Sequence, residues 1–265
     1  MKRLALLSLM AAFAASAAVA GDDDWKLRIK KESDGWSASF TGPIQYGSSH
    51  NRVKGSGIKV EKVRPLGAFS KLRIEGPFDV KLMQAGSDQA TVIADDNIEP
   101  LVETAVEGDS LVVRMRRDAG FTTRSAPVVR LDARALQAIT VNGSGDLAVE
   151  RFKADGLSLN VVGSGDVHFG LVELKDLSVG ISGSGDVRLA GRAEQQSWSI
   201  SGSGDVDARA LAGRAAKVAI NGSGDVALGV TEQLDVQLSG SGDLSYAGRP
   251  QLRQSVSGSG EIHRR

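Results

Sequence analysis

The four-residue sequence Gly-Ser-Gly-Asp occurs six times in this chain, and a seventh copy ends in Glu. The acidic residues are 18 to 20 positions apart, at Asp146, Asp166, Asp186, Asp205, Asp225, Asp243 and Glu261. A unit this short cannot bury an apolar side by itself, so consecutive units have to stack and share one core. The repeat therefore restricts the chain to a solenoid-like fold.

Apolar residues recur in step with these corners. One series lies two residues before each first glycine and another directly after each acid: Val141, Val161, Ile181, Ile200, Ile220, Leu238 and Val256, then Leu147, Val167, Val187, Val206, Val226, Leu244 and Ile262. Around them apolar and polar residues alternate, which is the period of a β-strand. We therefore predict an all-β parallel β-helix (β-solenoid) of about seven coils, paired in parallel at about 4.8 Å. Each coil is expected to run as strand, Gly-Ser-Gly turn, strand and variable polar connection such as AGRAEQQ.

Both ends of the repeat array depart from this pattern. Gln254 and Arg264 stand in columns that are apolar elsewhere, which predicts a solvent-facing terminal coil. Upstream, alternation and turn residues predict more irregular strands near 69–75, 78–84, 89–94, 101–106 and 110–116. We interpret GSGIKVEKV, from Gly55, as a diverged early turn, and GPFDV, from Gly76, as a fixed bend under the first coil.

The N-terminus has the parts of a secretory signal peptide. Lys2-Arg3 precedes an apolar run to about residue 17, and Ala18-Val19-Ala20 offers small residues for cleavage. No second apolar run is long enough to span a bilayer, so we expect no membrane span in the mature chain. We predict a signal peptide at 1–20, an N-terminal extension or linker at 21–53, and a single β-helix domain at 54–265. Within that domain we expect irregular strands at 54–135 and regular 18–20-residue repeats at 136–265.

Composition and motifs narrow the chemistry. Cysteine is absent, which excludes disulfides, thiol catalysis and thiolate metal sites. Lys+Arg and Asp+Glu each number 32, so no basic excess indicates nucleic-acid binding. The histidines, His50, His168 and His263, are expected at surface positions, and no hydrolase, P-loop, metalloprotease or dinucleotide-binding fingerprint occurs. We predict that the chain is not an enzyme and needs no cofactor, calcium being the one exception considered.

The row of acids admits three interpretations. Stacked carboxylates repel one another, so each needs a stabilising partner. The preferred interpretation is structural: each carboxylate accepts N–H groups of its Gly-Ser-Gly turn or a neighbouring Ser hydroxyl. The second is calcium, with candidate ligands Asp146, Asp166, Asp186, Asp205, Asp225 and Asp243. The third is recognition of an extended glycan by the stacked serines, Ser144, Ser164, Ser184, Ser203, Ser223, Ser241 and Ser259.

The segments FSKLRIEGPFDVKLMQ, ADDNIEPLVET and GDSLVVRM, followed by the Gly-Ser-Gly-Asp coils, resemble the head GIN domain family. The resemblance covers roughly residues 52–263 and rests on Gly76 to Val80, Gln84, Asn97 and the repeated corners. Proteins of that family are labelled putative autotransporter adhesins. The resemblance implies a right-handed β-helix in an exported bacterial protein, and it transfers no catalytic residue.

These observations predict an exported, non-catalytic binding or adhesin-like protein of the cell envelope. Its partner would be an envelope protein or a glycan, and its location the periplasm or the exterior of a Gram-negative bacterium. Two alternatives stay open at this point. One is a carbohydrate-processing enzyme on a β-helix, which needs converging acids in the variable connections. The other is a purely structural envelope protein without a ligand.

Overall fold

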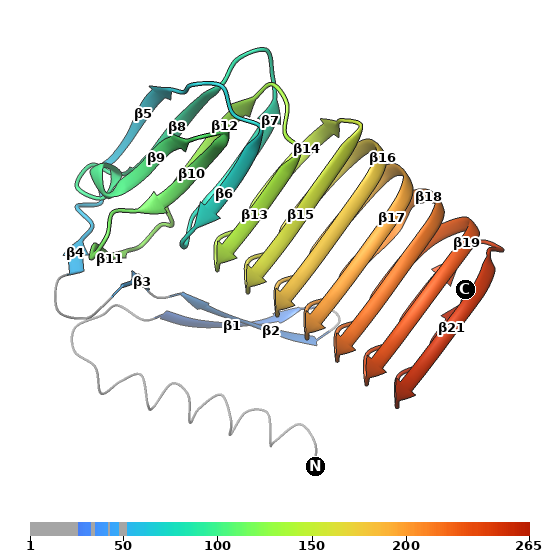
Figure 1. Ribbon diagram of the computed structural model, residues 1–265. Coiled ribbons are helices and arrows are strands. Elements are labelled where there is room, and N and C mark those ends of the chain that lie inside the picture. Colours follow the sequence, from blue (N-terminus) through green and yellow to red (C-terminus); the bar gives the residue numbers. More distant parts are fainter. Residues whose placement is uncertain (1–25, 33–34, 42, 48–51) are drawn as a thin grey trace.

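The computed structural model of the protein describes residues 26–32, 35–41, 43–47 and 52–265, so the predicted signal peptide lies outside the described residues. The predicted β-solenoid is confirmed: parallel strands stack into one elongated array (Figure 1). Its regular part consists of β13 (Ala138–Gly143), β14 (Leu147–Lys153), β15 (Gly156–Gly163), β16 (Val167–Gly183), β17 (Val187–Gly202), β18 (Val206–Gly222), β19 (Val226–Gly240), β20 (Leu244–Ala247), β21 (Gln251–Gly258) and β22 (Ile262–Arg264). The array makes about six turns, because seven corners bound six intervals. The right-handed sense and the domain boundaries stay predictions.

One coil, β16, shows how the sequence produces a closed turn. Inward and outward residues alternate along it, but two pairs, Gly170-Leu171 and Lys175-Asp176, each place two consecutive residues outward. Each pair shifts the alternation by one residue, so the chain bends and begins a new straight stretch. The coil therefore has three straight stretches, at 167–169, 172–174 and 177–183, around a shared apolar interior.

The variable connections are part of the strands, contrary to the expectation of polar loops. The stretch AGRAEQQ lies within β17 and pairs with β16 and β18. Its Ala193 and Gln196 side chains are buried. The bulges that let neighbouring coils differ in length lie just before these positions, between Phe169 and Val172 for example.

The corner glycines are required by the close approach of stacked backbones. Gly183 has φ +136°, a region that side chains rarely adopt. A Cβ at this position would lie 2.1 Å from the carbonyl oxygen of Gly163 in the preceding coil. Between the corners, the two predicted apolar columns pair coil by coil, as in Val161 to Ile181 to Ile200, and are buried up to the last coil. The repeated corner is therefore a packing requirement.

The first half of the chain joins the same sheet, as predicted, but its coils do not stack in chain order. It contributes β5 (Lys59–Pro65), β6 (Lys71–Glu75), β7 (Asp79–Gln84), β8 (Gln89–Asp95), β9 (Val102–Glu107), β10 (Ser110–Met115) and β12 (Val128–Ala133). The 3-10 turn η2 (Glu99–Leu101) precedes β9, and β11 (Gly120–Thr123), between β10 and β12, belongs to a separate sheet. β6 pairs in parallel with both β10 and β13, and β7 with both β12 and β14. The coil of β6 and β7 thus lies between a later segment and the first regular coil (Figure 1).

Antiparallel strands cover the N-terminal end of the stack. β9 pairs antiparallel with β10, and β8 pairs antiparallel with both β12 and β5. The sequence GSGI at Gly55 leads into β5 of this cap, so its interpretation as a diverged solenoid corner is wrong. The reason is that β5 pairs with β8 in the antiparallel sense, whereas a solenoid coil pairs in parallel.

The cap contains one buried carboxylate that is fully paired. The Glu99 side chain is 1% exposed and contacts Lys62 Nζ at 2.8 Å and the Arg64 guanidinium. Arg64 also donates to the carbonyl oxygen of Val102 at 2.6 Å, which ties the start of β9 to β5. Burial raises the pKa of Glu99, but hydrogen bonds and positive charge from Lys62 and Arg64 outweigh burial and hold the pKa below its usual value.

Glu99→Gln is expected to lower the free energy of unfolding at pH 7 by about 1–3 kcal/mol, because the amide cannot neutralise both cations. The folded-state pKa is lowered, so this stabilisation is present above the unfolded pKa of about 4.3 and is lost as pH falls through the folded-state value. Urea unfolding at pH 7, 5, 4 and 3 should show the difference between variant and parent shrinking below about pH 4. Glu61→Gln, at an exposed glutamate of the same cap, is the control for removing one charge. An equal effect at every pH would contradict the assignment.

The C-terminal coil is solvent-facing, as Gln254 and Arg264 predicted. β21 pairs with β19 and β22 with β20, and both lie at the end of the stack. Most of β21 is exposed, and Val256 in the apolar column is 44% exposed. Polar residues in this last coil limit the apolar surface at the open edge.

The remaining strands lie upstream of the cap. β1 (Lys26–Glu32) and β2 (Gly35–Thr41) form an antiparallel pair within the predicted N-terminal extension or linker. β3 (Ile44–Tyr46), β11 and β4 (Arg52–Lys54) form a three-stranded sheet. In that sheet Phe121 is fully buried and stacks on Tyr46 at 5.8 Å.

Candidate functional site

The predicted site residues form a hydrogen-bonded ladder along the corners. The Oδ1 atom of each aspartate accepts the backbone N–H of the acidic residue in the next coil. The distances are 2.8 to 3.0 Å for the pairs Asp146–Asp166, Asp166–Asp186, Asp186–Asp205, Asp205–Asp225, Asp225–Asp243 and Asp243–Glu261. In the opposite direction, the N–H of the residue after each acid donates to the carbonyl oxygen of the next acid, as from Val167 to Asp186 at 2.8 Å.

The structural interpretation of the acids is supported, but the hydrogen-bond partner of each carboxylate differs from the one expected. The carboxylate was expected to bond within its own turn or to a serine. It bonds instead to the neighbouring coil, where the strand pairing is interrupted at the corner and an N–H needs an acceptor. The serines at the second corner position are exposed, and only Ser259 and Ser241 join their hydroxyls, at 3.1 Å, among the described hydrogen bonds.

The ladder begins one corner earlier than the repeat indicates. Gly76-Pro77-Phe78-Asp79 stacks directly beneath the first Gly-Ser-Gly-Asp, since Val80 pairs with Leu147 and donates its N–H to the Asp146 carbonyl at 2.7 Å. The Asp79 carboxylate also lies next to the backbone N–H of Asp146. Burial, and then the negative charge of Asp146, raise the pKa of Asp79. Sequence comparison of the corners missed this position because Pro and Phe replace Ser and Gly.

Calcium ligation by Asp146, Asp166, Asp186, Asp205, Asp225 and Asp243 stays a prediction. One oxygen of each carboxylate is already engaged by a backbone N–H of the next coil. Within the described ranges no three His, Asp or Glu side chains converge as a metal-binding group. A calcium ion would therefore have to bind single oxygens of neighbouring coils.

Asp186→Ala is expected to lower the free energy of unfolding by about 1–2 kcal/mol, because the Asp205 N–H loses its acceptor. Asp186→Asn keeps a carbonyl oxygen at the same place and removes a negative charge from the row, so a change below about 0.5 kcal/mol is expected. Urea unfolding of the two variants measures the difference. Equal losses in both would show that the charge, and not the acceptor, matters.

The two shorter sides of the coils carry paired charges. Lys153 and Glu173 lie 2.7 Å apart on neighbouring coils, and Arg214 donates to Glu232 at 3.0 Å. His168 is exposed, and His263 contacts Glu261 at 3.0 Å, so both are surface residues as predicted, whereas His50 lies outside the described residues. Such exposed pairs add little stability and indicate a solvated surface.

The long side, by contrast, is almost without charge. Its outward residues in β13, β15 and the last stretches of β16 and β17 form what we call the neutral face. They are Ala138, Thr140, Asn142, Ser158, Asn160, Val162, Ser178, Gly180, Ser182, Ser197, Ser199 and Ser201. Charged residues occupy the same columns on both sides of this stretch: Lys71, Arg73 and Glu75 in β6, and Lys217, Asp235 and Arg253 in the last three coils.

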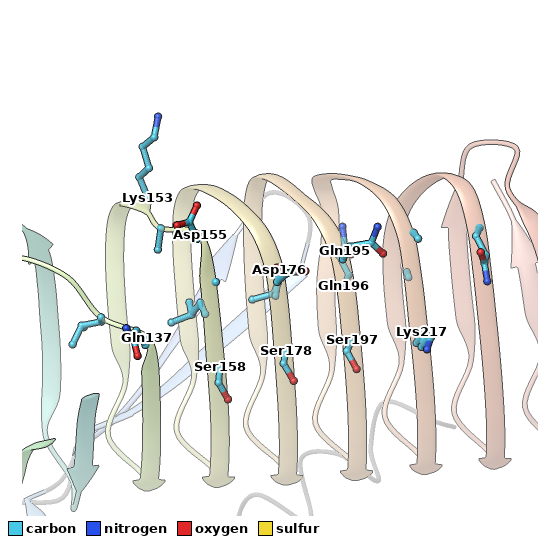
Figure 2. A pocket seen from close by; sticks show the side chains of 18 of the residues that line it. Gln137, Lys153, Asp155, Ser158, Asp176, Ser178, Gln195, Gln196, Ser197 and Lys217 are labelled. Carbon is cyan, nitrogen blue, oxygen red and sulfur yellow. The ribbon is translucent and has the colours of Figure 1, made fainter. Parts of the chain in front are cut away.

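An open groove of about 1170 Å³ runs along one margin of this face, across the coils. Small residues, among them Ala154, Gly156 and Ala215, line it together with hydroxyl and amide side chains. Ser158, Ser178 and Ser197 follow one another in register along its length, as Figure 2 shows. On the opposite margin the Lys175 ammonium hydrogen-bonds Asp155 and lowers the pKa of that carboxyl. Sequence reasoning placed the serine row at the corners and missed this one.

One polar atom of the groove is left without a partner. Asp235 Oδ2 accepts a hydrogen bond from Gln233 Nε2 at 2.8 Å, while its Oδ1 is buried and accepts none in the described chain. Lys217 is the neighbour of Asp235 in register, yet no ion pair joins them among those of the described residues. A buried acceptor without a donor is costly, so Asp235 marks the point of the groove where a donor would be gained.

Comparison with solved structures shows the same fold in several bacterial proteins. A "putative adhesin" from Bacteroides fragilis has a TM-score of 0.78 and 24% identity, with 80% of this chain and 100% of that chain covered. A "putative lipid binding protein" from Parabacteroides distasonis has a TM-score of 0.68 and 22% identity, covering 81% and 100%. A "putative adhesin" from Parabacteroides merdae has a TM-score of 0.66 and 21% identity, covering 81% and 99%. At these identities the likeness shows the fold alone.

Comparison with curated proteins finds no match. In the described part of the chain, no helix has the length and apolar character needed to cross a bilayer. A family match covers residues 68–250, which include β8 and β9 of the cap, the aspartate ladder up to Asp243 and the groove. The chain therefore belongs to the family described as "putative auto-transporter adhesin, head GIN domain".

Proposed function

We propose that this chain is an exported, non-catalytic binding protein of the bacterial envelope with an adhesin-like role. The observation that carries the proposal is the family match over residues 68–250, in a solenoid that presents the same outward positions on successive coils. Repeated positions let an extended partner be held at several points, so that individually weak contacts act together. The partner is an envelope protein or a glycan.

The proposed location is the periplasm or the cell exterior. The adhesin family implies a place in the envelope or outside the cell, and the sequence of residues 1–20 has the parts of a signal peptide. Leu7→Arg, which interrupts the apolar run, is expected to keep the chain in the cytoplasm at its unprocessed mass. Fractionation of cells expressing the parent and the variant, followed by immunoblotting, measures this. Identical distribution of the two would contradict export by this segment.

Adherence tests the binding role directly. Beads coated with residues 21–265 are expected to retain bacterial envelope fragments, because the solenoid surface supplies the contacts. Beads coated with the same chain after thermal unfolding are the control, since they carry the same residues without the register of the stacked strands. Retention equal to that of the unfolded control would contradict an adhesin-like role.

A further inference from the structure

We infer that the groove lined by Ser158, Ser178, Ser197, Gln233 and Asp235 binds an uncharged polysaccharide that lies across the coils. The inference rests on the proposed function and names the ligand class of that surface. Three independent properties of the groove carry it: its direction, the chemistry of its lining, and the unpartnered acceptor at one end.

The direction of the groove suits an extended chain. Its lining comes from six successive coils, from Leu136 through Leu157, Leu177, Gln196 and Ala216 to Gln233 in register or neighbouring positions. At about 4.8 Å per coil, five steps make a groove of about 24 Å. A small molecule would fill a fraction of this length, whereas a polymer of repeating units would meet the same side chains at each coil.

The lining matches a sugar polymer in both polarity and shape. Sugars present hydroxyl groups at their edges and C–H groups on their ring faces. The groove offers Ser, Gln and Asp side chains for the hydroxyls, and small residues such as Ala154 and Ala215 along its bottom for the ring faces. The adjoining neutral face carries no charge over β13 to β17, so a charged polymer gains no general attraction there.

Asp235 supplies a specific contact. Its Oδ1 is a buried acceptor without a donor, and the only group of the described chain that donates to the carboxylate is the amide of Gln233. Gln233 is exposed and lines the same groove, so it can rotate away and admit a ligand hydroxyl. Donation by that hydroxyl completes the hydrogen bonding of Asp235.

Other partner classes fit less well. A lipid chain needs a deep apolar cavity, whereas the leucines beneath the groove, Leu157 and Leu177, are at most 3% exposed and belong to the core. An acidic polymer needs clustered cations. The groove is lined by two lysines, Lys153 and Lys217, beside three aspartates. Binding of a lipid or of an acidic polymer is therefore included as a possible outcome of the test below.

The experiment is affinity electrophoresis of residues 21–265 through native gels containing dextran, mannan, xyloglucan or mixed-linkage β-glucan. Gels with polygalacturonate, and flotation with phosphatidylethanolamine–phosphatidylglycerol vesicles, provide the acidic and lipid arms. We expect slower migration in at least one neutral polysaccharide and none in polygalacturonate. No slowing in any neutral gel, slowing in polygalacturonate alone, or flotation with vesicles alone would each overturn the inference.

Matched variants locate the site. Ser178→Arg places a long cation across the groove and is expected to weaken binding about tenfold or more, while Asp235→Ala weakens it about fivefold through loss of one hydrogen bond. Ser182→Arg is the control: it is the same change on the same strand, also exposed, but outside the groove. Equal loss in Ser178→Arg and Ser182→Arg would assign binding to another surface. Melting curves of all three variants check that each is folded.

The adherence assay separates this inference from the proposed function. If coated beads retain envelope fragments but no neutral polysaccharide slows the protein, the glycan groove is wrong and the adhesin-like role stands. If neither is observed, both fail. If retention is lost in Ser178→Arg and kept in Ser182→Arg, the same groove carries both properties.

Discussion

Gly183→Ala is expected to lower the free energy of unfolding by about 3 kcal/mol or more. Two causes act together. Gly183 has φ +136°, where an alanine is strained by about 1–3 kcal/mol. Its Cβ would also lie 2.1 Å from the Gly163 carbonyl oxygen, which cannot move without breaking the pairing of two coils. Urea unfolding followed by far-UV circular dichroism measures the loss.

Two further glycines separate these causes. Gly185→Ala meets the Gly165 carbonyl oxygen at 2.3 Å without a positive φ, so it tests the close approach alone. Gly86→Ala has open space around its Cβ and no positive φ, and is expected to be neutral or slightly stabilising, by up to about 1 kcal/mol. A Gly183→Ala protein as stable as Gly86→Ala would show that the stacked corners are not as close as described.

Trp198→Ala is expected to destabilise the protein by about 3–5 kcal/mol. Trp198 is 1% exposed and occupies the inner column between Val179 and Val218 of the adjacent coils. Its indole Nε1 donates to Gln196 Oε1 at 3.1 Å, and Gln196 Nε2 donates to the Ala193 carbonyl oxygen at 3.3 Å. The substitution therefore leaves a cavity and also removes the donor that bonds to the buried amide oxygen of Gln196.

Variants of the pair distinguish the two contributions. Trp198→Phe retains most of the volume and loses the donor, so a loss of about 1–2 kcal/mol is expected. Adding Gln196→Leu to Trp198→Phe removes both polar partners and should recover part of that loss, provided the leucine fits the same space. If the double variant loses as much free energy of unfolding as the two single variants together, the Gln196 amide is satisfied elsewhere.

The aspartate ladder changes the meaning of the repeat. Asp186 accepts the backbone N–H of Asp205 in the next coil, so each corner supplies a hydrogen-bond acceptor to its neighbour. This hydrogen bond offsets part of the repulsion between stacked carboxylates, because the N–H at each corner gains an acceptor. The last copy, Glu261, donates its N–H to Asp243 in the same way.

The candidate groove could not be predicted from the sequence, because it depends on which outward columns come together. Ser158, Ser178 and Ser197 are 20 and 19 residues apart, a spacing visible in the sequence, yet many exposed columns share it. The absence of charge on one side and the pairing of charges on the others emerge only when the coil is divided into its three stretches. The unpartnered Asp235 oxygen likewise requires coordinates.

The sequence by itself determined the strands, the parallel stacking, the corner and the solvent-facing last coil. These follow from local alternation and from a repeat that puts equivalent residues in contact, so one unit predicts the next. Only the tertiary structure decided that β6 and β7 lie between β10–β12 and β13–β14, and that Asp79 begins the ladder. The physical reason is that these contacts join segments of different sequence, for which no repeat dictates the register. Burial of the whole core determines these contacts.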